Sequence, residues 1–187
     1  MRNQRESISL QKLALILVDQ KFENDHLIKG FNDLCSLSQG KEGGDDKPSE
    51  ASFLEYLIFD LFTDHACFLL AFGREVASVL FETYSINILL RLTGTRYKVD
   101  WQEFMVLFDK RATEYHEYLQ EYDPERLKNI DSNYLPRLGK AFSGYFVGCK
   151  DPAVIYQADG MFVLKLRYFY GEFLKKIVQE YEITLSE

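Results

Sequence analysis

The sequence predicts an all-α fold, an irregular bundle of about six helices around a buried central helix. Two observations lead to this prediction. Apolar residues recur along most of the chain at the i, i+3 and i+4 spacing of an amphipathic helix. Capping residues, prolines and glycines interrupt that pattern where helices are expected to begin and end. With 187 residues, 47% hydrophobic and 27% charged, the chain has the composition of a single globular domain covering residues 1–187.

The first helical region extends from Ile8 to Leu37, either as one bent helix or as two helices divided at Asn24-Asp25. Residues 38–50 follow, with three glycines, one proline and no apolar side chain. This composition predicts a flexible loop. Because the residues before it are too few for a core of their own, we expect the loop to lie within the single domain.

The central helix follows this loop. Ser52 and Glu55 have the spacing of a capping box, in which each side chain satisfies a backbone N–H of the first turn. From there to Phe72 the chain is apolar on nearly every side, which is typical of a helix buried in the middle of a domain. Gly73 marks a break, and a further helix with one apolar stripe continues to Leu92.

Later helices are marked by prolines and caps. Asp100 is placed to cap a helix whose apolar face carries several aromatic residues. Pro124 and Pro152 each follow an aspartate, the usual arrangement at a helix start. Pro136 indicates that another segment begins near it, because proline is unfavourable inside a helix.

The C-terminal stretch has two interpretations. Residues 161–170 are rich in residues typical of strands, and Asp159-Gly160 has the composition of a hairpin turn, so an α+β fold with a hairpin near 154–170 remains open. The helical spacing of apolar residues continues through Tyr181, and this favours a helix.

Charge and cysteine content limit the possible partners and compartments. The chain has 22 basic and 29 acidic residues, a net charge of −7, and no long basic stripe, so we expect no nucleic-acid partner. No apolar run approaches the length of a membrane span, and we expect no membrane partner. The three cysteines, Cys35, Cys67 and Cys149, are far apart and favour thiols in a reducing compartment. A cytoplasmic protein is therefore expected.

Asp60 and Asp64 are the most informative polar residues. They lie on the same side of the predicted central helix, where a bare charge would cost several kcal/mol. We expect them to be paired, hydrogen-bonded or protonated, either in a network that fixes helix packing or as the polar floor of a pocket. The partners expected from the sequence are tyrosine hydroxyls, Arg74, Arg91, Arg96 and His65.

The leading functional hypothesis is a non-enzymatic interaction or assembly module that uses aromatic-rich helix faces. The 28 aromatic side chains (15 Phe, 12 Tyr and 1 Trp) suggest it, because such residues dominate both cores and interfaces. The partner would be another protein or a second copy in a homodimer. The interface candidates are Tyr168, Phe169, Tyr170, Phe173 and Tyr181.

The alternative hypothesis is a helical protein that binds a small molecule or a metal, in one version an enzyme. Its interior pocket would be lined by Asp60, Asp64, His65, His26 and His116. No cofactor is expected, since the chain has no phosphate-binding loop, no dinucleotide-binding glycine motif and no nucleophile elbow. The two hypotheses differ in whether these side chains converge.

Overall fold

The structure, a computed structural model, describes residues 6–38, 50–97, 99–119, 136–148 and 151–184. Helices dominate these residues, and the all-α prediction is confirmed. The elements in chain order are β1 (Glu6–Ser9), α1 (Leu10–Phe22), the 3-10 turn η1 (Glu23–Asp25), α2 (His26–Ser38), α3 (Glu50–Phe72), α4 (Arg74–Leu92), α5 (Trp101–Leu119), α7 (Pro136–Val147), α8 (Pro152–Leu164), the π-helix η2 (Lys165–Leu174), α9 (Lys175–Glu180) and β2 (Tyr181–Thr184).

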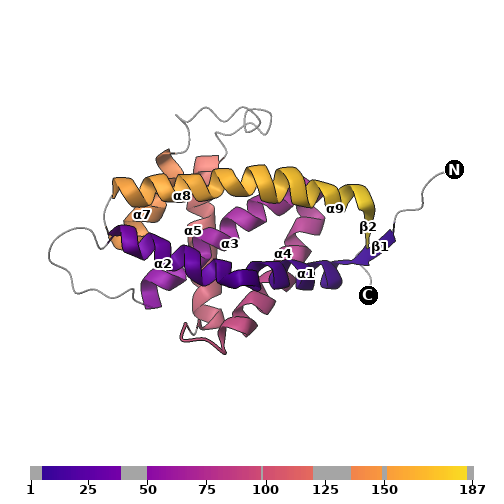
Figure 1. The fold of residues 1–187 in the computed structure, drawn as a ribbon, viewed down its shortest axis with the longest axis horizontal. Helices are drawn as coiled ribbons and strands as arrows, with labels where there is room; N and C mark the ends of the chain where they lie inside the picture. The colour runs from indigo at the N-terminus through magenta and orange to yellow at the C-terminus, as the bar shows by residue number, and fades with distance from the viewer. Residues whose placement is uncertain (1–5, 39–49, 98, 120–135, 149–150, 185–187) are drawn as a thin grey trace.

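Two long helical arms run side by side over the other helices (Figure 1). The N-terminal arm consists of α1 and α2, residues 10–38, and the C-terminal arm is the continuous rod of α8, η2 and α9, residues 152–180. The arms run in opposite directions, and α3, α4 and α5 pack behind them. At one end of the molecule β1 and β2 form a parallel pair, with Glu6 opposite Tyr181.

The hairpin alternative for residues 154–170 is wrong, because these residues lie in α8 and η2. Asp151 caps α8 by accepting a hydrogen bond from the Ala153 backbone N–H at 2.9 Å. Along the helix Val154, Ala158, Phe162 and Leu166 recur every four residues, and all are buried. Burying this stripe stabilises the helix more than the strand propensity of the local composition disfavours it.

The helix α3 is the buried central element that the sequence predicts. Every residue from Phe53 to Asp64 is buried. The predicted capping box is wrong, because α3 begins at Glu50 and Ser52 lies inside it. Glu55 instead forms an ion pair with Arg111 of α5.

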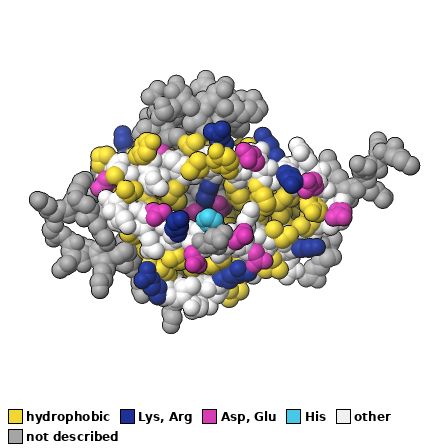
Figure 2. All heavy atoms as spheres, viewed as in Figure 1, with side chains coloured by type: hydrophobic (Ala, Val, Ile, Leu, Met, Phe, Trp, Pro, Cys, Tyr) yellow, Lys and Arg dark blue, Asp and Glu magenta, His cyan; other side chains and the backbone are white. Residues whose placement is uncertain are grey.

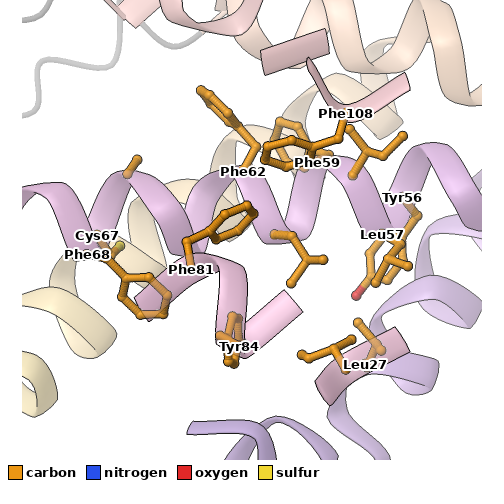
Figure 3. Close-up of a cluster of buried hydrophobic side chains, with 14 of the residues drawn as sticks. Leu27, Tyr56, Leu57, Phe59, Phe62, Cys67, Phe68, Phe81, Tyr84 and Phe108 are labelled. Atoms are coloured by element: carbon orange, nitrogen blue, oxygen red, sulfur yellow. The ribbon is translucent and has the colours of Figure 1, made fainter. Parts of the chain in front are cut away.

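Much of the aromatic content forms the core around α3 (Figure 3). The ring centroids of Phe59 and Phe142 are 4.4 Å apart, and those of Phe81 and Phe108 are 5.0 Å apart. Such offset and tilted contacts are favourable for aromatic pairs. Among the described residues the fully buried tyrosines are Tyr56, Tyr84 and Tyr115.

Most other predicted boundaries are confirmed within the described residues, but Ile8, where the first helical region was expected to begin, lies in β1, and α1 begins at Leu10. The N-terminal region is a pair of helices divided by η1, and α4 follows Gly73, whose φ of +75° suits glycine. Asp100 caps α5 by accepting from the Glu103 N–H at 2.9 Å. The predicted helix start at Pro124, Cys149 and residues 39–49 of the predicted loop lie outside the described residues. None of the described helices is long and apolar enough to span a membrane.

Candidate functional site

Two aspartates of α3 and two lysines form a buried cluster of four charges. The Lys21 ammonium contacts Asp60 Oδ2 and lies 2.6 Å from Asp64 Oδ2. The Lys165 ammonium lies 2.7 Å from Asp60 Oδ1 and 2.7 Å from Asp64 Oδ1. Lys165 also donates to the Asp60 carbonyl oxygen at 2.6 Å. Each carboxylate therefore bridges both ammonium groups, and the cluster is charge-balanced.

Three elements supply this charge cluster. Asp60 and Asp64 are one helical turn apart on α3, so their side chains share a face. Lys21 lies in the last turn of α1, where a cation is favoured by the helix dipole. Lys165 is the first residue of the π-helix η2. The cluster thus ties both arms to the central helix, and the widened helix at Lys165 is a feature often found at functional sites.

Mutual attraction keeps Lys21 and Asp60 ionised despite their burial. Burial by itself would lower the pKa of Lys21, but the charges of Asp60 and Asp64 outweigh it and hold that pKa well above its usual value. Burial would raise the pKa of Asp60, but Lys165 and Lys21 together lower it. Both groups are therefore charged at neutral pH.

Two tyrosines flank the charge cluster. The Tyr84 hydroxyl of α4 donates a hydrogen bond to Asp64 Oδ2 at 2.9 Å. Tyr56 lies one turn before Asp60 on α3 and is only 2% exposed, and its hydroxyl points toward Leu27 of α2 (Figure 3). Burial, followed by the nearby carboxylates, raises the pKa of both phenols well above the usual value. Both phenols therefore stay protonated at neutral pH.

A pocket of about 320 Å³ opens above the charge cluster, between the two arms and α3. Figure 2 shows this face of the molecule, where a histidine and charged side chains gather between the arms. The floor carries Tyr56, Tyr84 and the four charged residues. The rest of the lining is Leu17, Gln20, His26, Leu27, Gly30, Gln157, Met161, Leu164 and Phe169. The pocket therefore has largely apolar walls over a polar floor.

Three of the five pocket residues named from the sequence meet at this pocket, namely Asp60, Asp64 and His26. The other two, His65 and His116, are not part of its lining and lie next to each other, with ring centroids 6.3 Å apart. Within the described residues no group of three or more His, Cys, Asp or Glu side chains is arranged to hold a metal ion.

The histidine pair lies in an apolar environment. His65 packs against Phe81 in a tilted arrangement, with ring centroids 4.6 Å apart, and neither of its buried ring nitrogens has a hydrogen-bond partner in the described structure. Burial, with a smaller contribution from His116, lowers the pKa of His65 to about 4. Burial also lowers the pKa of His116. Both rings are therefore neutral at neutral pH.

The sequence reasoning missed the lysines of the site. It expected arginines or His65 beside the aspartates, whereas the observed cations are Lys21 and Lys165. The expected tyrosine partner is confirmed by Tyr84. A usable signal was present at Lys165, which is a single cation between leucines in the apolar run that precedes Arg167. A lysine inside such a run needs a buried partner.

The arginines have other partners or are exposed. Arg91 pairs with Asp19 at the surface, Arg96 contacts the Tyr97 ring and hydroxyl, and Arg74 is exposed. Asp60 and Asp64 are therefore paired with the two lysines and not with the three arginines expected from the sequence.

The interface candidates differ in exposure. Tyr168 is 48% exposed. Phe169, Tyr170, Phe173 and Tyr181 are partly buried and pack against the core. Most of these rings therefore already have contacts within the chain.

Comparison with known proteins gives no relative. No family model matches the chain, and neither a curated protein nor a solved structure is significantly similar to it. Function is therefore inferred from the geometry of the site.

Proposed function

We propose that this protein binds a small molecule with an apolar body in the pocket between the two arms. The observation that carries the proposal is a pocket of about 320 Å³ with largely apolar walls and a few converging polar groups, a size and lining common to small-molecule sites. Leu17, Leu27 and Met161 are among the apolar wall residues. The polar groups lie together on the floor, so a ligand would be oriented by one end.

Binding is favoured over catalysis by the titration of the floor groups. A general acid or base works best with a pKa near the working pH. Here the pKa of Lys21 is raised, that of Asp60 is lowered, and those of Tyr56 and Tyr84 are raised. These four groups therefore hold their protonation state at neutral pH, which suits a fixed binding surface better than proton transfer.

A titration with N-phenyl-1-naphthylamine, an uncharged apolar fluorophore, tests this proposal. We expect saturable fluorescence enhancement with the full chain. In Met161→Trp a two-ring side chain would occupy part of the pocket, and we expect binding at least about tenfold weaker. Arg167→Trp introduces the same side chain at an exposed position of the same arm and should bind like wild type. Absence of saturable binding, or equal binding by Met161→Trp and wild type, would reject the proposal.

A second candidate, self-association, is favoured by one observation. Tyr156, Leu164 and Tyr168 of the C-terminal arm are 81%, 55% and 48% exposed, and they recur at multiples of four residues. An exposed apolar stripe of this kind is typical of interaction surfaces. We propose a second copy of the chain as the partner, in keeping with the assembly hypothesis.

Sedimentation equilibrium tests this second candidate. A dimer is expected for wild type and a monomer for Tyr156→Lys, because a buried unpaired charge at an interface is strongly unfavourable. Val106→Lys places the same charge at a 74% exposed position of α5 and should remain dimeric. A monomeric wild type would rule out the homodimer.

A further inference from the structure

We infer that the ligand of this pocket carries an uncharged oxygen, a hydroxyl or a carbonyl, as its polar group. The inference rests on the proposed function and specifies the substrate class of the same site. It derives from the charge balance of the floor, from the hydrogen-bonding capacity that the floor has left, and from the position of Tyr56.

The first argument is charge balance. The floor holds two ammonium groups and two carboxylates, each within ion-pair distance of both opposite charges. A ligand carboxylate would meet Asp60 and Asp64 as well as the lysines, and a ligand ammonium would meet Lys21 and Lys165 as well as the aspartates. Neither ion would gain a net attraction sufficient to offset the loss of its hydration. An uncharged polar group loses far less hydration on entering.

The second argument is the capacity left on the floor. An ammonium has three N–H donors. Lys165 has three oxygen acceptors in contact, namely Asp60 O, Asp60 Oδ1 and Asp64 Oδ1. Lys21 contacts two, one oxygen on each aspartate. Among the described residues one donor of Lys21 therefore remains for an acceptor oxygen of the ligand.

The third argument is Tyr56. Its side chain is 2% exposed and lines the pocket, and no hydrogen bond joins its hydroxyl to another described residue. A Cβ on Gly30 would lie 2.5 Å from this hydroxyl oxygen. A larger residue at position 30 would therefore displace the hydroxyl from the pocket lining. A phenol both donates and accepts hydrogen bonds. Tyr56 can therefore donate to a carbonyl oxygen or exchange hydrogen bonds with a hydroxyl.

Three probes with the same eight-carbon chain distinguish the head groups. Isothermal titration calorimetry with the full chain at neutral pH would compare 1-octanol, octanoate and octylammonium, each below its aggregation limit. We expect 1-octanol to bind at least about tenfold more tightly than either ion, because each ion loses its hydration without an unpaired counter-charge. We expect Tyr56→Phe to weaken 1-octanol binding roughly three- to tenfold through the loss of one hydrogen bond.

Tyr118→Phe is the matched control, because it removes the same hydroxyl from a tyrosine of α5 that does not line the pocket. It should leave octanol binding unchanged. If octanoate or octylammonium binds as tightly as 1-octanol, the head-group inference is overturned while the proposed function stands. If none of the three probes binds, both are overturned. Equal octanol affinity in Tyr56→Phe and wild type would likewise overturn the inference, provided that both unfold at the same temperature.

Discussion

Asp64 and His65 are neighbours in the sequence, but Asp64 lies among charged and polar side chains, whereas His65 lies in an apolar environment. On one side of α3, Asp64 lies between Lys21, Lys165 and Tyr84. On another side, His65 lies against Phe81 and His116, with both ring nitrogens unpartnered in the described structure. The two residues share a backbone segment, so the difference comes from what the other helices present to them.

The comparison shows two ways of accommodating a titratable side chain at low exposure. Opposite charges from two arms keep Asp60 ionised, whereas an apolar environment keeps the histidines neutral. The first arrangement leaves a polar surface that a ligand can contact. The second leaves none, and it becomes unfavourable when a proton is added.

The largest expected effect is on the charged side of this comparison. Asp64→Asn keeps the side-chain size but leaves two buried ammonium groups facing one carboxylate. Removing one partner of a buried ion pair costs about 3–5 kcal/mol, and we expect a loss of this order in the free energy of unfolding by urea.

Asp19→Asn is the matched control, because it breaks an ion pair with Arg91 whose side chains are 65% and 43% exposed. Exposed pairs contribute about 0–1 kcal/mol. Equal losses in the two variants would mean that burial adds nothing to the aspartate–lysine cluster, and the contrast with the histidines would fail.

The second largest effect is expected at the neutral His65, and it is a loss of stability at low pH. The pKa of His65 is lowered from 6.5 to about 4 in the folded protein, so the unfolded chain binds the proton more readily. The stability that neutral His65 contributes is therefore full above pH 6.5 and is lost as the pH falls from 6.5 to 4. Since one pKa unit corresponds to about 1.4 kcal/mol, the loss should be on the order of 2–3 kcal/mol.

Urea unfolding between pH 7 and pH 4.5 measures this loss, and His65→Phe should flatten the dependence. Asp60 has a lowered pKa, so it contributes mainly at more acidic pH. The raised pKa of Asp159, about 7, opposes the loss between pH 7 and pH 4, and the lowered pKa of His116 adds to it, so the contribution of His65 is the difference between wild type and His65→Phe. An unchanged slope in His65→Phe would contradict the assignment to His65.

The smallest effect tests the edge of the charge cluster. Tyr84→Phe removes the hydroxyl that donates to Asp64 Oδ2, and a hydrogen bond to a charged group contributes roughly 1.5 kcal/mol at the lower end of its range. Thermal unfolding followed by circular dichroism would detect this loss. Tyr168→Phe, at an exposed site, should change stability by less than about 0.5 kcal/mol. If Tyr84→Phe and wild type unfold at the same temperature, the hydrogen bond from α4 does not stabilise the charge cluster.

Much of the fold could be predicted because helical spacing and caps are local signals. The buried central helix, the Asp100 and Asp151 caps and the break at Gly73 all follow from residues close in sequence. The β1–β2 pair was not predicted, since its partners come from opposite ends of the chain. The C-terminal helix predicted from the helical spacing was also too long, because Tyr181 begins β2 rather than continuing the helix.

Of the four residues in the charge cluster only the two aspartates could be predicted, because local spacing does not show which distant residues pack against them. The i, i+4 spacing placed Asp60 and Asp64 on one face and required partners for them. Which cations would reach that face depended on how α1 and the C-terminal arm pack, and that is not encoded in local spacing. The nearer arginines in the sequence are Arg74 and Arg91, whereas the cations in contact come from residues 21 and 165.

The β1–β2 pair has a consequence for how the chain reaches its native state. The Thr184 hydroxyl donates to the Ile8 carbonyl across 176 residues of sequence. Closing so long a loop costs chain entropy that only a preassembled helical core can offset. The strand pair should therefore form late in folding, after the helices have packed. Once formed, it would fix the end of the C-terminal arm, which carries Lys165, to the strand that precedes α1.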